Sequence, residues 1–193
     1  MATTRLTRHI RAPRSRVYRA LLDADAVQRW QVPDIMTSRV HAFDAREGGE
    51  FRISLTYDAP TGTGKTTAQT DTYHGRFTRL VPDTEVVQVV EFETPDPALG
   101  GEMTITYTLA DAGDGGTVLT GTHENLPPGV RPEDNELGWS QSIGKLARMV
   151  EDGAGADLQA REGGVVRDAA EVLREHFGEH RVLRRRRREQ RHR

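Results

Sequence analysis

The sequence predicts an α+β fold in which one long helix covers the apolar face of a seven-stranded antiparallel sheet. Short segments of alternating apolar and polar residues recur along the chain, which is typical of strands with one buried and one solvated face. After these segments, apolar residues recur in steps of four, three and four at Trp139, Ile143, Leu146 and Val150, on one side of a helix. Because a one-sided sheet must bury its apolar face, we expect this helix to lie against it.

The elements are expected in the order strand, two helices, six strands, helix. A first strand is predicted over residues 6–12, Pro13 then opens a helix, and Asp25 is expected to cap a second helix that ends near Trp30. The six further strands are predicted at residues 38–43, 50–57, 70–81, 85–93, 102–109 and 117–123. Alternation is clearest in two of them, where the apolar phase consists of Phe51, Ile53, Leu55 and Tyr57, and of Met103, Ile105, Tyr107 and Leu109.

The long helix is predicted over residues 132–151, after a turn at Pro127, Pro128 and Gly129. Pro132 suits a first helical turn because its missing N–H would have no partner there. Three acidic residues follow within the next four positions and complement the positive end of the helix dipole. This is the one long helix expected inside the body of the protein.

Composition excludes several classes of protein. The chain of 193 residues has 35% hydrophobic and 29% charged residues, no apolar run near the ~18 residues of a membrane span, and no secretion signal. We therefore expect a cytoplasmic protein. Since the chain contains no cysteine, it has no disulfide, thiolate metal site or thiol nucleophile.

Charge and composition predict a domain over residues 1–152 and, over residues 153–193, a linker, a possible helix and an Arg-rich tail. The first part has 16 basic and 22 acidic residues, whereas the second has 11 basic and 7 acidic residues. The unbroken arginine run at residues 184–188 is either a solvated, disordered tail or a weak electrostatic contact. It lacks the interleaved aromatic residues of a reading element, so no specific nucleic-acid partner is predicted.

The element order and several phrases resemble the bacterial members of the activator of heat-shock-protein-90 ATPase homologue family. The resemblance covers residues 4–151, and its phrases are IRAPRSRVYRALLDADAVQRW, GGEFRI, HGRFTRLVPDTEVVQVVEFE and HENLPPGVRPEDNELGWSQSIGKLARMVE. That family belongs to the START-like, polyketide-cyclase-like (SRPBCC) superfamily. The resemblance implies a helix-grip fold, in which a curved seven-stranded sheet wraps a long C-terminal helix and leaves a cavity between them.

Our leading functional hypothesis is the binding of a small apolar or aromatic ligand in this cavity, without a cofactor or a metal. Whether the helix stripe closes a solid core or walls a pocket is left open by the sequence. A pocket of this kind has apolar walls with a few polar groups. The predicted walls are Trp30, Phe51, Ile53, Phe77, Met103, Ile105, Trp139 and Ile143.

Two alternatives come from other functional classes. A cyclase- or dehydratase-like enzyme would use His123 and Glu91 as acid and base, since desolvation moves both pKa values toward neutrality. Strand alternation, however, favours a solvent-facing Glu91. A co-chaperone function ranks last, because eukaryotic co-chaperones of the family carry an additional N-terminal domain and this chain begins at its first strand. The oligomeric state is open, and a homodimer is compatible with the sequence.

Two motifs suggest other chemistry but lack its context. Gly64, Lys65 and Thr66 end the phrase APTGTGKT like a phosphate-binding loop, yet the chain continues into an alternating strand rather than a helix. We predict a flexible hairpin tip. His176 and His180 belong to an HxxEH sequence, but a catalytic zinc needs a third ligand and a walled site, so an exposed tail helix is expected.

Overall fold

The computed structural model describes residues 2–59 and 64–153. Contacts divide the chain into two units, Met1–Glu151 and Asp152–Arg193, and the fold described here is that of the first. Its elements are β1 (Ala2–Ile10), α1 (Arg14–Leu21), α2 (Ala24–Trp30), β2 (Met36–Phe43), β3 (Glu50–Tyr57), β4 (Thr70–Val81), β5 (Glu85–Phe92), β6 (Met103–Asp111) and β7 (Thr117–Leu126). A helix over residues 132–153, here called the C-terminal helix, follows them.

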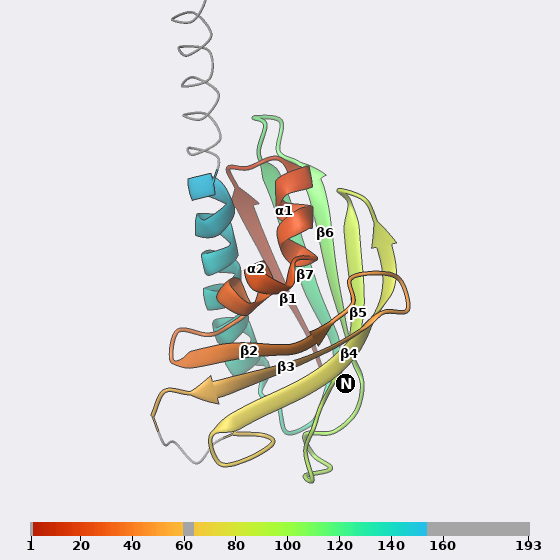
Figure 1. Ribbon diagram of the computed structural model, residues 1–193, viewed down its shortest axis with the longest axis vertical. Helices are drawn as coiled ribbons and strands as arrows, with labels where there is room; N and C mark the ends of the chain where they lie inside the picture. Colours follow the sequence, from red (N-terminus) through yellow and green to blue (C-terminus); the bar gives the residue numbers. More distant parts are fainter. Residues whose placement is uncertain (1, 60–63, 154–193) are drawn as a thin grey trace, which may run out of the picture. The chain divides into compact units, whose positions relative to one another are not determined.

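The seven strands form one antiparallel sheet in the order β1-β7-β6-β5-β4-β3-β2. Strands β2 to β7 follow one another as neighbours, and β1 joins the far edge by pairing with β7 (Figure 1). Helices α1 and α2 connect these two edges. Irregularities in register occur in β1, β2 and β4, and such bulges bend a sheet. The predicted helix-grip arrangement is therefore confirmed.

One predicted helix cap was wrong. Asp23, not Asp25, caps α2, and its carboxylate accepts a hydrogen bond from the Ala26 N–H at 2.7 Å. A capping side chain reaches the N–H two or three residues further along the chain, and α2 begins at Ala24, two residues earlier than a cap at Asp25 requires. Asp25 lies instead in the first turn, where its charge complements the helix dipole.

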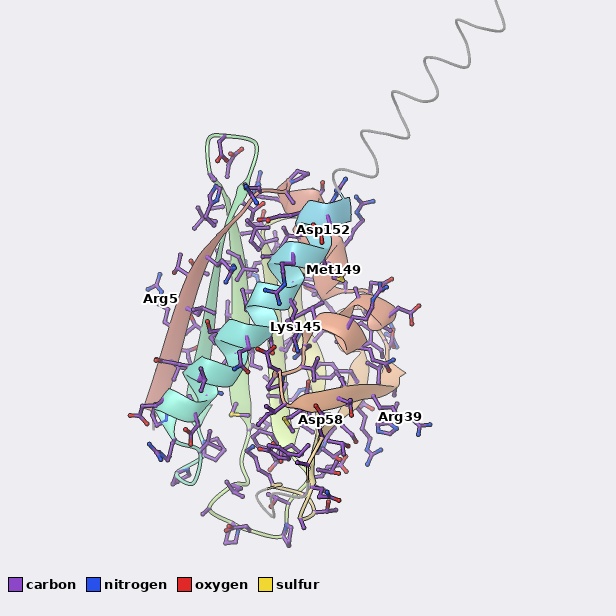
Figure 2. All side chains as sticks on the ribbon, turned by 90° about the vertical axis from the view of Figure 1, so that its left-hand side faces the viewer. Arg5, Arg39, Asp58, Lys145, Met149 and Asp152 are labelled. Carbon is purple, nitrogen blue, oxygen red and sulfur yellow. The ribbon has the colours of Figure 1, made fainter. Side chains whose placement is uncertain are left out.

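The predicted stripe of the C-terminal helix is buried. Trp139, Ile143, Leu146 and Val150 all belong to the hydrophobic core, whereas Leu137, outside the stripe, is 63% exposed. Figure 2 shows the helix lying along the face of the sheet. Lys145 fastens it to the segment after α2 by donating to two backbone carbonyl oxygens there, at 2.8 and 3.1 Å.

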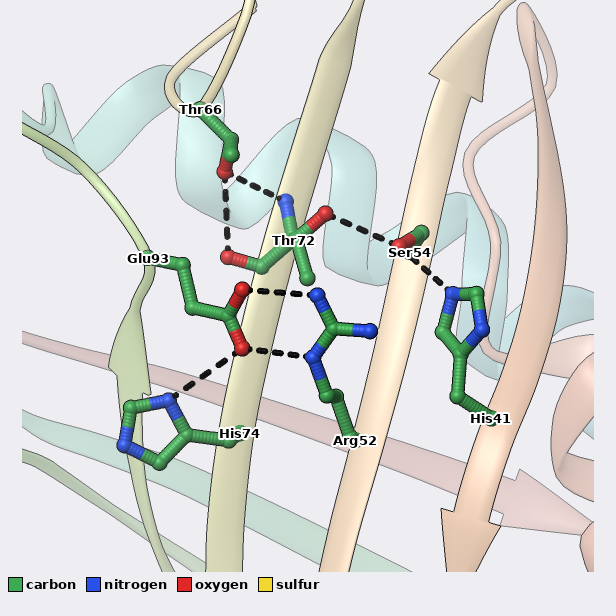
Figure 3. Close-up of polar contacts among 7 residues, drawn as sticks. All are labelled: His41, Arg52, Ser54, Thr66, Thr72, His74 and Glu93. Carbon is green, nitrogen blue, oxygen red and sulfur yellow. Dashed lines mark hydrogen bonds and ion pairs between the residues drawn. The ribbon is translucent and has the colours of Figure 1, made fainter.

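The opposite face of the sheet is polar, as the alternation predicts. Figure 3 shows its side chains on the side of β3 and β4 away from the C-terminal helix, whose ribbon passes behind the strands. Arg52 donates to both carboxylate oxygens of Glu93, at 2.7 and 2.8 Å, and His74 lies 3.7 Å from the same group. Ser54 exchanges a hydrogen bond with Thr72. In the described part of the chain, no helix has the length and apolar character needed to cross a membrane.

The closest approach of helix and sheet yields a stability prediction. A Cβ at Gly121 would overlap ring atoms Cζ2 and Cη2 of Trp139, so Gly121→Ala should lower the free energy of unfolding by about 1–3 kcal/mol. Gly144→Ala is the matched control, because its Cβ would meet only the guanidinium groups of Arg8 and Arg148, at 3.7 and 3.8 Å, and alanine favours a helix by up to about 1 kcal/mol. Urea unfolding measures both changes, and equal midpoints for the two variants would contradict the prediction.

Candidate functional site

The interior between the sheet and the C-terminal helix contains all eight residues predicted to wall a ligand site. Each is at most 6% exposed, and all eight belong to a single cluster of buried residues. The aromatic side chains form two groups. Phe43, Phe51 and Phe77 pack together at centroid distances of 5.1–6.1 Å, while Tyr107 makes edge-to-face contacts with Trp30 and Trp139.

A row of polar residues interrupts this apolar face. In register, Gln88 of β5 pairs with Ile105 of β6, Ile105 pairs with His123 of β7, and His123 pairs with Thr4 of β1. Residues paired directly across an antiparallel sheet share a face. All four are buried, so Gln88 and His123 lie on either side of Ile105 in the interior.

His123 is held in one orientation by two contacts. Its ring stacks on Trp139 at a centroid distance of 3.7 Å, and its Nδ1 lies 3.1 Å from the side-chain oxygen of Asn135. The same oxygen accepts from the Thr4 hydroxyl at 2.7 Å. An amide oxygen only accepts hydrogen bonds, so Nδ1 carries the proton and Nε2 carries the lone pair.

The imidazole of His123 is neutral at physiological pH. Burial lowers the pKa of His123 to about 4, and the hydrogen bond to Asn135 opposes this shift without overcoming it. The Nε2 atom is therefore a neutral hydrogen-bond acceptor facing the interior.

Three buried polar atoms in this interior have no hydrogen-bond partner among the described residues. They are Nε2 of His123, Oε1 of Gln88 and Nε1 of Trp139. The first two atoms accept hydrogen bonds, whereas the indole N–H donates one. Ser38 Oγ is the fourth such atom in the described chain, and it lies on β2, at the sheet edge opposite β1.

Two buried phenols share the interior. Burial raises the pKa of Tyr73 well above its usual range, and Tyr107 adds a smaller contribution. Burial also raises the pKa of Tyr107, although the neighbouring Trp139 N–H opposes this shift. That N–H approaches the Tyr107 hydroxyl without reaching hydrogen-bond geometry. Both phenols are therefore protonated and neutral at physiological pH.

The interior of the described chain carries no free cation. Among its buried side chains, the acidic and basic groups are Asp71 and His123. Asp71 is paired with Lys65, whose ammonium group also lies 5.0 Å from the ring centroid of Phe92. The interior is consequently close to neutral.

The structure does not bring Glu91 and His123 together. In β5 the buried residues are Val86, Gln88 and Val90, so Glu91 lies in the opposite phase, on the other face of the sheet. Its carboxylate accepts from the Gly101 N–H at 2.9 Å. Among the described residues, the hydrogen-bond partner of the His123 ring is an amide rather than a carboxylate.

Of the remaining motifs, the structure describes only part of the APTGTGKT phrase. Thr66 leads into β4 and not into a helix, so the phosphate-loop interpretation fails as predicted. The HxxEH sequence and the arginine run lie outside the described residues. Within the described ranges, no three His, Asp or Glu side chains are grouped so that they could hold a metal ion.

Two residues of the site were missed by sequence reasoning. Gln88 could have been found, because it occupies the apolar phase of the run EVVQVVEFE between Val86 and Val90. Asn135 could not, because its role depends on how the start of the C-terminal helix lies against β7 and β1, which no local pattern encodes.

The buried imidazole predicts an acid sensitivity. Since the pKa of His123 falls from 6.5 to about 4 on folding, the unfolded chain binds more protons between these values. The lowered pKa of His123 therefore changes the free energy of unfolding by roughly 3 kcal/mol. This contribution is fully present above about pH 6.5 and is lost as the pH falls toward 4. His123→Phe, which retains a ring for stacking, should therefore lose less stability than the wild type between pH 7.5 and 4.5 in urea unfolding.

The exposed His41 provides the control for this measurement, and His41→Asn should retain the wild-type pH dependence. A His123→Phe variant with the same pH dependence as the wild type would show that the pKa of His123 does not fall on folding.

Comparison with known proteins agrees with this architecture. A family model described as Activator of Hsp90 ATPase homolog 1-like protein matches residues 11–151. Among solved structures, protein CV1439 from Chromobacterium violaceum is 36% identical, with a TM-score of 0.69 and coverage of 77% of this chain and 96% of that chain. A comparison with curated proteins found no match.

Two more distant structures share the fold. An AHSA1-like protein from Aeromonas hydrophila is 21% identical, with a TM-score of 0.60 over 79% of this chain and 94% of that chain. DynU16, a protein of the dynemicin biosynthetic locus, is 21% identical, with a TM-score of 0.55 over 78% of this chain and 48% of that chain. The resemblance found in the sequence is confirmed. Since the family model covers more than half of its residues, the chain belongs to the family of Activator of Hsp90 ATPase homolog 1-like proteins.

Proposed function

We propose that the protein binds a small, largely apolar or aromatic molecule between the sheet and the C-terminal helix. The observation that carries this proposal is a set of three unpartnered polar atoms among the apolar walls of the same interior. Gln88, His123 and Trp139 each expose a polar atom to this interior without a partner among the described residues. A few such groups on apolar walls are the form that small-molecule sites take.

Ser38 on β2 aside, other buried polar side chains of the described chain, such as those of Thr117 and Ser142, do have partners. Thr117 donates to the Ala12 carbonyl oxygen at 2.7 Å, and Ser142 donates to the Gly138 carbonyl oxygen at 3.0 Å. Buried polar groups without partners cost about 1–3 kcal/mol each, so such groups are few in folded proteins. Their grouping around His123 therefore supports a site whose partner atoms are supplied by a ligand.

Neither alternative function has an observation that favours it. An acid–base pair of His123 and Glu91 would have to act through the sheet, because the two side chains lie on opposite faces. The Hsp90-related description belongs to the family model, and the described surface offers no feature that identifies a chaperone as partner. We therefore propose binding without assigning a reaction.

The two tryptophans allow a direct test by nitrogen-15 NMR. The Trp30 indole N–H donates to the Ala20 carbonyl oxygen at 2.9 Å, whereas the Trp139 N–H is unpartnered, so their two signals should differ. Titration with a panel of bicyclic aromatic molecules should shift the Trp139 signal as its N–H gains an acceptor. Native mass spectrometry of the purified full chain should detect a co-purified small molecule.

The control signal is the Arg52 Nε–H, which is paired with Glu93 on the opposite face of the sheet and should not move. Shifts confined to Arg52, or no shift of Trp139 with any molecule of the panel, would argue against an interior binding site.

A further inference from the structure

We propose that the ligand is uncharged and carries a hydroxyl group, which donates a hydrogen bond to His123 Nε2 and accepts one from the Trp139 indole N–H. A second donor on the ligand is bound by Gln88 Oε1. This inference rests on the proposed function and names the chemical class of the ligand, an alcohol or a phenol.

The pairing of a donor and an acceptor selects a hydroxyl group. His123 Nε2 can only accept, because Asn135 holds the ring proton on Nδ1, and the Trp139 N–H can only donate. The two rings stack at 3.7 Å with an angle of 27° between their planes, so the unpartnered acceptor and the unpartnered donor are carried by neighbouring rings in the buried interior. A hydroxyl donates and accepts at once, whereas a ketone or an ether oxygen only accepts and leaves His123 without a partner.

Gln88 provides a separate acceptor. It lies on β5 and His123 on β7, with Ile105 of β6 between them in register. The two outer strands are therefore about 9–10 Å apart, which is too far for one ligand hydrogen to serve both acceptors when the side chains stand upright. A ligand with two donors separated across Ile105 would satisfy both atoms.

The electrostatics of the interior disfavour an anion. The one buried carboxylate of the described chain, Asp71, is paired with Lys65, and His123 is neutral. A ligand carboxylate would enter this space without a cation to pair with, and two acceptors already line it. Burying an unpaired charge costs more than any hydrogen bond available there returns. Fatty acids and other carboxylates should therefore bind poorly.

Three probes of nearly equal shape test the inference at pH 7.5: 2-naphthol, 2-methoxynaphthalene and 2-naphthoate. Binding is followed by the Trp139 indole signal and by the nitrogen-15 shift of His123 Nε2. We expect 2-naphthol to bind about tenfold more tightly than 2-methoxynaphthalene, because only the naphthol supplies a donor. Naphthol should also shift His123 Nε2, and naphthoate should bind least.

Two variants separate the acceptors. His123→Phe keeps the stacked ring and should abolish the preference for 2-naphthol over its methyl ether. The second hydroxyl of 2,7-dihydroxynaphthalene is meant to reach Gln88 Oε1 and raise the affinity above that of 2-naphthol. Gln88→Met keeps the side-chain length and should abolish this gain in affinity. Glu91→Gln, on the opposite face of the sheet, is the matched control and should leave all affinities unchanged.

The outcomes distinguish this inference from the proposed function. If all three probes shift Trp139 with equal affinity, or if naphthoate binds most tightly, the site exists but the inference is overturned. If none of them shifts Trp139, both the proposed function and the inference fail. The His123 Nε2 shift in the wild-type protein tests the same contact without a substitution. The inference can therefore still be contradicted if a variant fails to fold.

Discussion

The contact between Trp139 and Gly121 is the constraint on which the rest of the structure depends. The inward positions of β7 are occupied by Leu119, Gly121 and His123, and only the glycine lets the indole lie directly against the sheet. The C-terminal helix can then bring its apolar stripe onto the face that the sheet must bury. The same approach stacks the indole on His123, so one contact closes the fold and shapes the site.

The properties of the site follow from that closure. Once the helix covers β7, His123 loses its water, and burial lowers its pKa because the charged imidazolium is disfavoured in an apolar medium. Asn135 lies at the start of the same helix, and its side-chain oxygen accepts a hydrogen bond from the ring N–H of His123. Charged side chains such as Arg52 and Glu93 lie on the other face of the sheet, where water solvates them. The sheet thus separates a neutral interior from a charged exterior.

The sequence predicted the fold more completely than the site, for a physical reason. Alternation and helical spacing are local properties, so the element order was confirmed, and β3 and β4 begin and end as predicted. The limits of β1 depend on its pairing with β7, which is far away in the sequence, and the prediction missed its first four residues. Composition could not decide between Asp23 and Asp25 as the cap, because both are residues that favour this position and they lie only two positions apart.

The geometry of the site is less predictable because it depends on how strands that are distant in the sequence are paired. His123 could be named from the sequence, but its neighbours could not. The position of Gln88 relative to His123 depends on two strand pairings, and the contact of Asn135 with His123 depends on the packing of a helix. An apolar side chain of similar size at position 88 would avoid the cost of an unpartnered oxygen. The fold does not require a polar residue there, because the paired residue in β6 is Ile105. The unpartnered oxygen is therefore not required by the sheet, and its missing partner is one that the proposed ligand could supply.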